Sequence, residues 1–116
     1  MSGRVHAVNG AAAPLEAPVA PERVLEGSPF TVAKVDYSRA DKVFAGEWTA
    51  TPGAWRVSYD EWEFCHILEG ACELVGDDDG VARRFEAGDS LIIEPGFVGV
   101  WRVLAPMRKR FVARYP

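Results

Sequence analysis

From Phe30 onwards, short apolar stretches alternate with turn signals along the chain. The turn signals are clusters of Gly, Pro and Asp that return about every 8 to 12 residues, which is the spacing typical of a β-sandwich or barrel. No window keeps apolar residues at helical spacing over three turns. The pattern therefore predicts an all-β domain. The turn signals fall at Gly46, Thr51–Gly53, Glu69–Gly70, Gly76–Gly80, Ala87–Asp89, Pro95–Gly96 and Pro106.

The N-terminal part of the chain lacks this pattern. Residues 1–25 are rich in Ala and Pro and show no sustained period, so we expect an arm with room for one short strand. The β domain is then predicted over residues 26–116. A length of 116 residues fits one domain of ordinary size and does not favour two.

Alternation within the strands separates an inner from an outer face, because successive side chains of a strand point to opposite sides. Over residues 55–68 one parity holds Trp55, Val57, Tyr59, Glu61, Glu63, Cys65 and Ile67. In the last strand the corresponding parity holds Met107, Lys109, Phe111, Ala113 and Tyr115. The second set places a lysine among apolar residues, facing inward.

An inward lysine needs a carboxylate, a ligand or a route to water, because a lone buried ammonium is costly. Glu63 also lies on an inward parity and is the natural partner of Lys109. Opposite charge would hold both groups ionised despite burial. The alternative is that the barrel mouth is wet and Lys109 extends its ammonium into water.

Charge and hydropathy exclude several partners. The chain has 13 Lys and Arg against 17 Asp and Glu, and a net charge of −4 does not favour nucleic acid or an anionic membrane. A basic cluster at Arg108, Lys109, Arg110 and Arg114 leaves a local anion site open. No stretch approaches the roughly 20 apolar residues of a membrane span, and no signal peptide is evident, so we expect a cytoplasmic protein.

The Cys, His and Asp residues do not form a familiar motif. Cys65 and Cys72 have no zinc-ligand spacing, and a disulfide framework is not expected. Cys65 and His66 are neighbours in one strand and point to opposite faces, so they cannot form a catalytic dyad. The run Asp77–Asp79 lacks the spacing of a calcium loop and is predicted to be a solvated hairpin turn.

Two segments resemble the conserved motifs of the cupin superfamily. In the first motif, G-x5-H-x-H-x3-4-E-x6-G, the matching residues are Gly53, Glu63 and Gly70. In the second, G-x5-P-x-G-x2-H-x3-N, Gly88 and Gly96 match and the proline, Pro95, comes one place late. The resemblance implies a double-stranded β-helix, which is the single-domain jelly-roll barrel of cupins.

A narrower resemblance is to the small branch related to the cupin domain of ureidoglycine aminohydrolase. It covers about residues 24 to 115 and is carried by Glu63–Gly70 (EFCHILEG), Gly88-Asp89, Pro95–Trp101 (PGFVGVW) and Arg108-Lys109. The full-length aminohydrolases of this relationship have two domains, depend on a metal and release ammonia from a ureido amine. The present chain departs from them in carrying a single cupin domain.

The metal ligands of cupins are absent from the aligned positions. Metal-binding cupins use three histidines and one glutamate, a donor set that suits divalent transition metals. Here the first-motif histidines fall on Val57 and Tyr59, and the second-motif histidine falls on Gly99. Only Glu63 remains, so we expect no tightly bound metal and no cofactor.

The prediction is a metal-free pocket that binds a small polar metabolite. Glu63, Lys109 and Tyr59 would supply its reactive or binding groups, and Trp55, Glu61 and Trp101 would line it. One alternative is an enzyme, related to ureidoglycine aminohydrolase or acting on another small nitrogenous or sugar-derived acid. In this enzyme Glu63 would act as the general base, and Lys109 or Tyr59 would polarise an oxyanion. Another is an interaction protein with a packed interior.

The outer face of the predicted strands indicates self-association. Trp62, Phe64 and Leu68 lie on the face opposite Glu63, where large apolar side chains are common in subunit contacts. Together with the N-terminal arm, they lead us to expect a homodimer.

Overall fold

The computed structural model describes residues 3–116, and nearly all of its regular structure is antiparallel β-sheet. Among these residues the only helical element is a single 3-10 turn, η1 (Pro21–Arg23). No helix in this part of the chain is long and apolar enough to cross a membrane. The strands are β1 (Leu15–Pro18), β2 (Val24–Gly27), β3 (Phe30–Arg39), β4 (Val43–Ala50), β5 (Gly53–Ser58), β6 (Trp62–Gly76), β7 (Ala82–Glu86), β8 (Ser90–Ile93) and β9 (Val98–Arg114).

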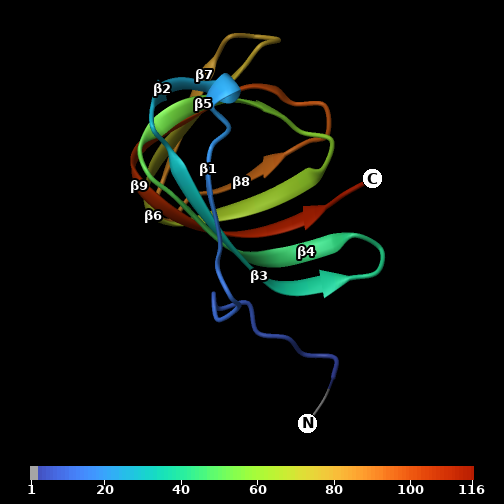
Figure 1. Ribbon diagram of the computed structural model, residues 1–116. Coiled ribbons are helices and arrows are strands. Elements are labelled where there is room, and N and C mark those ends of the chain that lie inside the picture. Colours follow the sequence, from blue (N-terminus) through green and yellow to red (C-terminus); the bar gives the residue numbers. More distant parts are fainter. Residues whose placement is uncertain (1–2) are drawn as a thin grey trace.

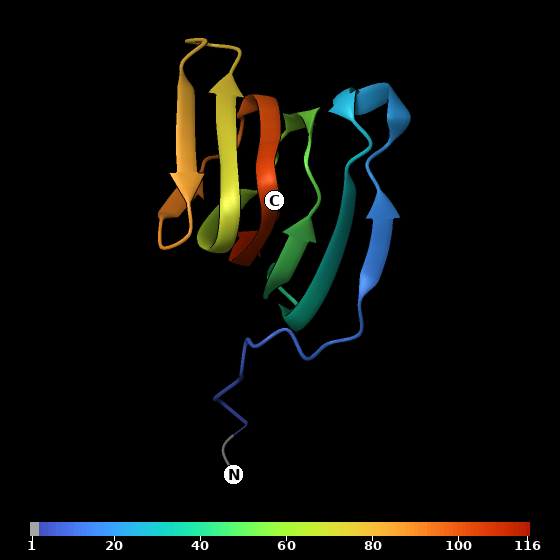
Figure 2. The same cartoon turned by 90° about the vertical axis from the view of Figure 1, so that its left-hand side faces the viewer.

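Two long strands, β6 and β9, pair with each other along their whole length and so belong to both halves of the barrel. The first half of β6 pairs with β8, and the second half of β9 pairs with β4. The other ends of β6 and β9 pair with β7 and β5. Figure 1 looks into the resulting barrel, and Figure 2 shows β7, β6 and β9 side by side. The predicted all-β, single-domain jelly roll is confirmed.

Both long strands bend where they pass from one half of the barrel to the other. The β6–β9 register shifts around Glu69 and Ala71, close to Gly70. Gly70 has φ +83°, and a Cβ there would lie 2.3 Å from the backbone oxygen of Pro106 on β9. Glycine is therefore required at this bend, both for the left-handed backbone and for the close approach of the two strands.

Alternation along β6 and β9 builds the core. The inward side chains of both strands are almost fully buried, and they pack with Trp55 and Val57 of β5. The predicted continuous strand over 55–68 is wrong in one respect, because β5 ends at Ser58 and β6 begins at Trp62. The chain crosses between the two halves of the barrel here. Tyr59 anchors the crossing through backbone hydrogen bonds with Phe97 and Gly96.

The N-terminal arm packs against the outer side of β3 and β4 (Figure 1). Its β1 pairs with β3, and β2 pairs with β5, so the second half of the arm is part of the sheets. Further upstream, the backbone N–H groups of Gly10 and Ala12 donate to the carboxylate of Asp36, at 2.8 and 3.0 Å. The His6 ring lies 4.9 Å from the ring of Tyr37.

Candidate binding pocket

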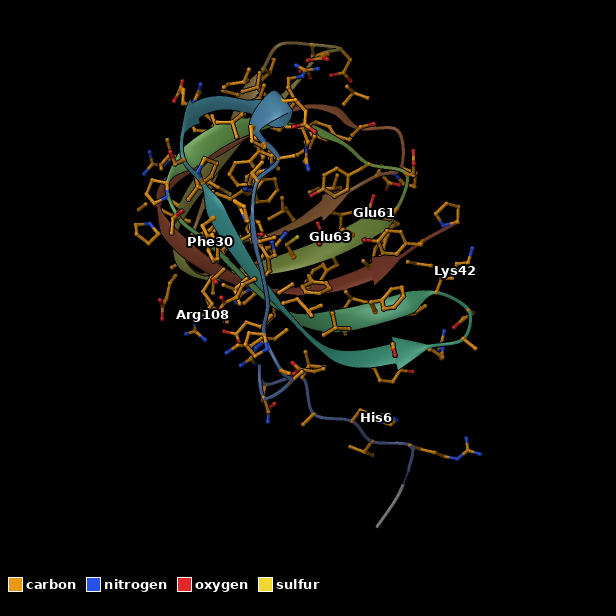
Figure 3. All side chains as sticks on the ribbon, viewed as in Figure 1. His6, Phe30, Lys42, Glu61, Glu63 and Arg108 are labelled. Atoms are coloured by element: carbon orange, nitrogen blue, oxygen red, sulfur yellow. The ribbon has the colours of Figure 1, made fainter. Side chains whose placement is uncertain are left out.

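A cavity of about 1260 Å³ opens at one end of the barrel. This exceeds the roughly 300–1000 Å³ of ordinary small-molecule sites, so a metabolite has room inside. The segment Ala17–Ala20 of the arm forms part of its wall, and Glu61 lies nearer the rim than Glu63 (Figure 3). The aromatic side chains that line it are Phe44, Trp48, Trp55, Tyr59, Trp101, Phe111 and Tyr115.

At the floor of the cavity, the ammonium of Lys109 faces the carboxylate of Glu63. The Nζ atom lies 3.4 Å from Oε1 and 3.5 Å from Oε2. Lys109 is 3% exposed and Glu63 is 9% exposed, so both charges are largely removed from water. Strand parity predicted that Lys109 points inward and meets Glu63. The observed burial and distances confirm both points.

Two indole rings enclose the same ammonium. Nζ lies 4.6 Å from the centroid of the Trp48 ring and 4.7 Å from that of Trp101, within the range of cation–π attraction. Burial is the largest single effect and would lower the pKa of Lys109, but the Glu63 carboxylate, together with Cys65 and Tyr59, outweighs it and the pKa is raised. Lys109 is therefore a permanent cation at physiological pH.

Cys65 is a fourth partner of Lys109, and the sequence analysis assigned it no role in the site. Its Sγ lies 3.4 Å from Nζ, and the residue is fully buried. Burial raises the pKa of this thiol to about 12, although the Lys109 charge acts in the opposite direction. Cys65 is thus a neutral thiol beside the ion pair. Cys65 shares the inward parity of Glu63, and this parity could have predicted that its side chain faces the ion pair.

The remaining predicted residues all lie in the pocket wall. Trp55 and Trp101 are buried, and Tyr59 is half-buried beside Glu63. Burial is the main cause that raises the pKa of Tyr59, so its hydroxyl keeps its proton. Glu61 sits next to Tyr115 at the rim, where burial and then the Glu61 charge raise the pKa of Tyr115 to about 12.

Sequence reasoning missed Trp48, which contacts Lys109 directly. Trp48 lies on β4, whose residues pair with β9 so that Trp48 stands opposite Lys109. Its ring packs edge-on against Trp101, with centroids 5.8 Å apart. The spacing of Phe44, Trp48 and Ala50 within one strand could have indicated this inward face. Within the described residues, the indole N–H of Trp101 is buried without a hydrogen-bond partner.

The pocket does not provide the donors of a cupin metal site. Val57 and Gly99, which stand at two of the histidine positions, are paired directly across β5 and β9 and carry no donor side chain. Glu63 is already engaged by Lys109. In residues 3–116 no three His, Cys, Asp or Glu side chains come together as a metal would require. The donor set therefore does not fit a divalent transition metal.

The four basic residues near the C-terminus do not share one face of β9. Arg108 points outward and bonds the carboxylates of Glu47 and Glu69, both at 2.8 Å. Arg110 and Arg114 are exposed, and only Lys109 faces the pocket. Strand alternation sends Lys109 inward and the three arginines outward, so the four charges do not form one cluster.

Two other sequence predictions concern the outside of the barrel. His66 points outward, and its Nδ1 lies 2.8 Å from Oγ of Ser90, while the neighbouring Cys65 points inward. The run Asp77–Asp79 is an exposed turn between β6 and β7, tied by Arg56 and Arg83. Both cysteines are free.

The jelly roll and its central pocket define a cupin. Residues 37–111 match the family of EutQ-like cupin domains, and the chain belongs to this family. A search of curated protein sequences finds no match.

Solved structures share the fold. A protein of unknown function of the DUF861 family from Pseudomonas syringae superposes with a TM-score of 0.80 at 18% identity, over 91% of this chain and 46% of that one. EutQ from Clostridium difficile gives 0.66 at 14% identity, over 74% of this chain and 63% of that one. The chain thus spans less than two thirds of the length of either protein. A DUF861 family protein from Thermotoga maritima gives 0.53 at 34% identity, over 56% of this chain and 73% of that one.

Proposed function

We propose that the barrel is a metal-free pocket that binds a small polar metabolite through Glu63, Lys109 and Tyr59. The observation that carries this proposal is the buried Lys109–Glu63 pair at the floor of a cavity of about 1260 Å³. A structural ion pair would normally be closed off by packing. A cavity of this size beside it also argues against a fully packed interior.

The ion pair has unused hydrogen-bonding capacity. Charge-assisted N–H···O bonds are usually about 2.7–2.9 Å long, whereas Nζ lies 3.4 and 3.5 Å from the Glu63 oxygens. Its third contact, Cys65 Sγ, is a weak acceptor. An ammonium with three N–H donors can therefore donate a hydrogen bond to a ligand oxygen, and Glu63 can accept one from a ligand N–H or O–H.

The ligand chemistry follows from this arrangement. One acceptor and one donor side by side would satisfy Lys109 and Glu63 together, as in a carboxamide, a ureide or a hydroxy acid. The pair is neutral as a whole, so the ligand needs no large net charge at this point. Indole walls at Trp55 and Trp101 favour a flat molecular body.

A second candidate is the enzyme related to ureidoglycine aminohydrolase, with Glu63 as general base. The protonated Tyr59 hydroxyl beside Glu63 favours it, because it could donate to a developing oxyanion. Against it, Lys109 and Tyr59 are both held in one protonation state near neutral pH. Such fixed states suit binding better than proton transfer.

The test is a thermal-shift screen of small carboxamides, ureides and hydroxy acids, followed by titration of Trp fluorescence. We expect at least one compound to stabilise the wild type, by about 2.7 kcal/mol when present at 100 times its dissociation constant. Glu63→Gln and Lys109→Met should each lose this response. Liquid chromatography of the incubated compound separates binding from turnover.

Matched controls lie on β7, where Arg84 and Glu86 are exposed and 4.0 Å apart. Arg84→Met and Glu86→Gln make the same chemical changes outside the pocket and should keep the ligand response. An unchanged response in both pocket variants would end the proposal. Elemental analysis that finds about one equivalent of transition metal in the purified protein would overturn its metal-free character.

A further inference from the structure

Apolar side chains form a continuous row on the outer surface of β8, β6 and β9. Phe64 of β6 stands opposite Ile92 of β8 on one side and opposite Val112 of β9 on the other. Ile92 is 55% exposed and Val112 is 38% exposed, and Phe64 is half-buried between them. Single exposed apolar residues are common on protein surfaces and need no explanation. Three adjacent ones in a row form a patch, which is typical of an interaction site.

Polar rows border this apolar row on both sides. On one side His66 lies between Ser90 and Arg110, and on the other Trp62 pairs with Arg114 while Glu94 directly follows β8. Glu94, Arg110 and Arg114 are all exposed. We call these nine residues the β8–β6–β9 surface; they are Ser90, Ile92, Glu94, Trp62, Phe64, His66, Arg110, Val112 and Arg114.

The neighbouring half of the same outer face is covered. Ala45 of β4 pairs with Val112 and continues its row, yet it is only 5% exposed. Glu47 is 7% exposed, and a Cβ at Gly10 of the arm would touch its carboxylate. The arm thus covers β3 and β4, whereas the β8–β6–β9 surface has no such cover within residues 3–116.

We propose that a second copy of this chain covers the β8–β6–β9 surface, packed face to face about a twofold axis parallel to β6. Such an axis exchanges the β8 side of one copy with the β9 side of the other. Phe64 then meets Phe64, and Ile92 meets Val112. Glu94 of each copy meets Arg114 of the other, so that the twofold axis creates two ion pairs between oppositely charged side chains.

Charge also decides the direction of the axis. An axis perpendicular to β6 would bring Arg114 against Arg110 and leave Glu94 against Ser90, so that like charges face each other twice. The parallel axis avoids this repulsion and keeps the strands of the two copies aligned, as in common sheet-on-sheet packing. The surface is therefore complementary to itself in one orientation.

The experiment is sedimentation equilibrium of the purified chain, with charge reversals. We expect the wild type to have twice the 12.7 kDa mass of the chain. Arg114→Glu and Glu94→Arg should each weaken the dimer about tenfold or more, because each reversal acts twice in a twofold assembly. The double variant, Glu94→Arg with Arg114→Glu, should restore it. Arg84→Glu on β7 is the control and should stay dimeric.

Two results would overturn the proposal. One is a wild type that stays monomeric at micromolar concentration. The other is a dimer that neither single reversal weakens, or that the double variant fails to restore, since either result would place the contact elsewhere. Circular dichroism of each variant shows that a loss of dimer is not a loss of fold. The ligand response of the pocket is measured separately and does not depend on this surface.

Discussion

At the scale of single residues, the pocket depends on two buried charges that need each other. Lys109 and Glu63 lie on different strands and meet inside the barrel. Because the folded pKa of Lys109 is raised above its ordinary value of 10.5, the stability it contributes is complete below that pH. It is lost only as the pH rises through the folded value. Lys109 thus keeps its charge at every physiological pH.

A double-mutant cycle measures this mutual dependence. Lys109→Met leaves the Glu63 charge buried without its cation and should lower the free energy of unfolding by about 3–5 kcal/mol. Adding Glu63→Gln should recover part of that loss, because an uncharged amide is less costly to bury than a lone carboxylate. Urea unfolding of the four proteins gives the coupling energy.

The control cycle uses Arg84→Met and Glu86→Gln on the exposed face of β7. It should show almost no coupling, because water screens a surface pair. A Lys109–Glu63 coupling as small as the β7 coupling would contradict the view that these two charges hold each other in place.

At the scale of elements, the barrel depends on the shared bend of β6 and β9. Gly70 has a left-handed backbone and lies against Pro106 of the neighbouring strand, so a side chain there has neither a favourable conformation nor space. The two strands must bend together for the same residues to serve both halves of the barrel. The position of Glu63 relative to Lys109 is set by their register.

Gly70→Ala should therefore destabilise the protein by about 2–4 kcal/mol, from backbone strain together with a steric clash. Gly88→Ala is the matched control, because Gly88 also has a positive φ of +95° but has open space around its Cα. It should cost only the backbone strain, on the order of 1 kcal/mol. Equal losses in the melting curves of the two variants would contradict a packing role for Gly70.

Sequence alternation predicted those features that depend on strand parity alone. The inward Lys109, the outward Phe64 and the opposed directions of Cys65 and His66 all follow from a period of two, and the structure agrees. The break between β5 and β6 could not be predicted this way, because it depends on where the chain crosses between sheets. Trp48 was missed for a similar reason, since its contact with Lys109 depends on which strand pairs with β9.

At the scale of the whole molecule, the N-terminal arm joins the outside of the barrel to its pocket. Asp36 holds Gly10 and Ala12 on the outer face, and the following segment Ala17–Ala20 lines the cavity. Although partial burial acts to raise the pKa of Asp36, the backbone N–H donors outweigh it and the pKa is lowered. Its contribution to docking is present above its ordinary value of 3.8 and is lost as the pH falls through the lower folded value.

Asp36→Asn should loosen the arm at neutral pH. We expect hydrogen exchange of the Gly10 and Ala12 amides to accelerate on the order of tenfold, because a charged acceptor is replaced by a neutral one. In the wild type, the protection of these two amides relative to their intrinsic exchange rate should fall in the same way once the pH drops below the folded pKa of Asp36. Asp41→Asn serves as control, since Asp41 pairs with Arg39 in the β3–β4 turn and does not contact the arm. Unchanged exchange in Asp36→Asn would mean that other contacts hold the arm.

The place of β9 in the order of synthesis has a consequence for how the protein is made. Its residues Val98–Arg114 join β4, β5 and β6, which are all translated earlier. While β9 is still inside the ribosomal tunnel, the emerged strands lack the partner that closes the barrel, and their apolar faces stay open to solvent or to chaperones. The barrel must therefore wait for β9 before it can close, and conditions that slow translation of the segment from β6 to β9 would lengthen the exposure of the emerged strands to aggregation.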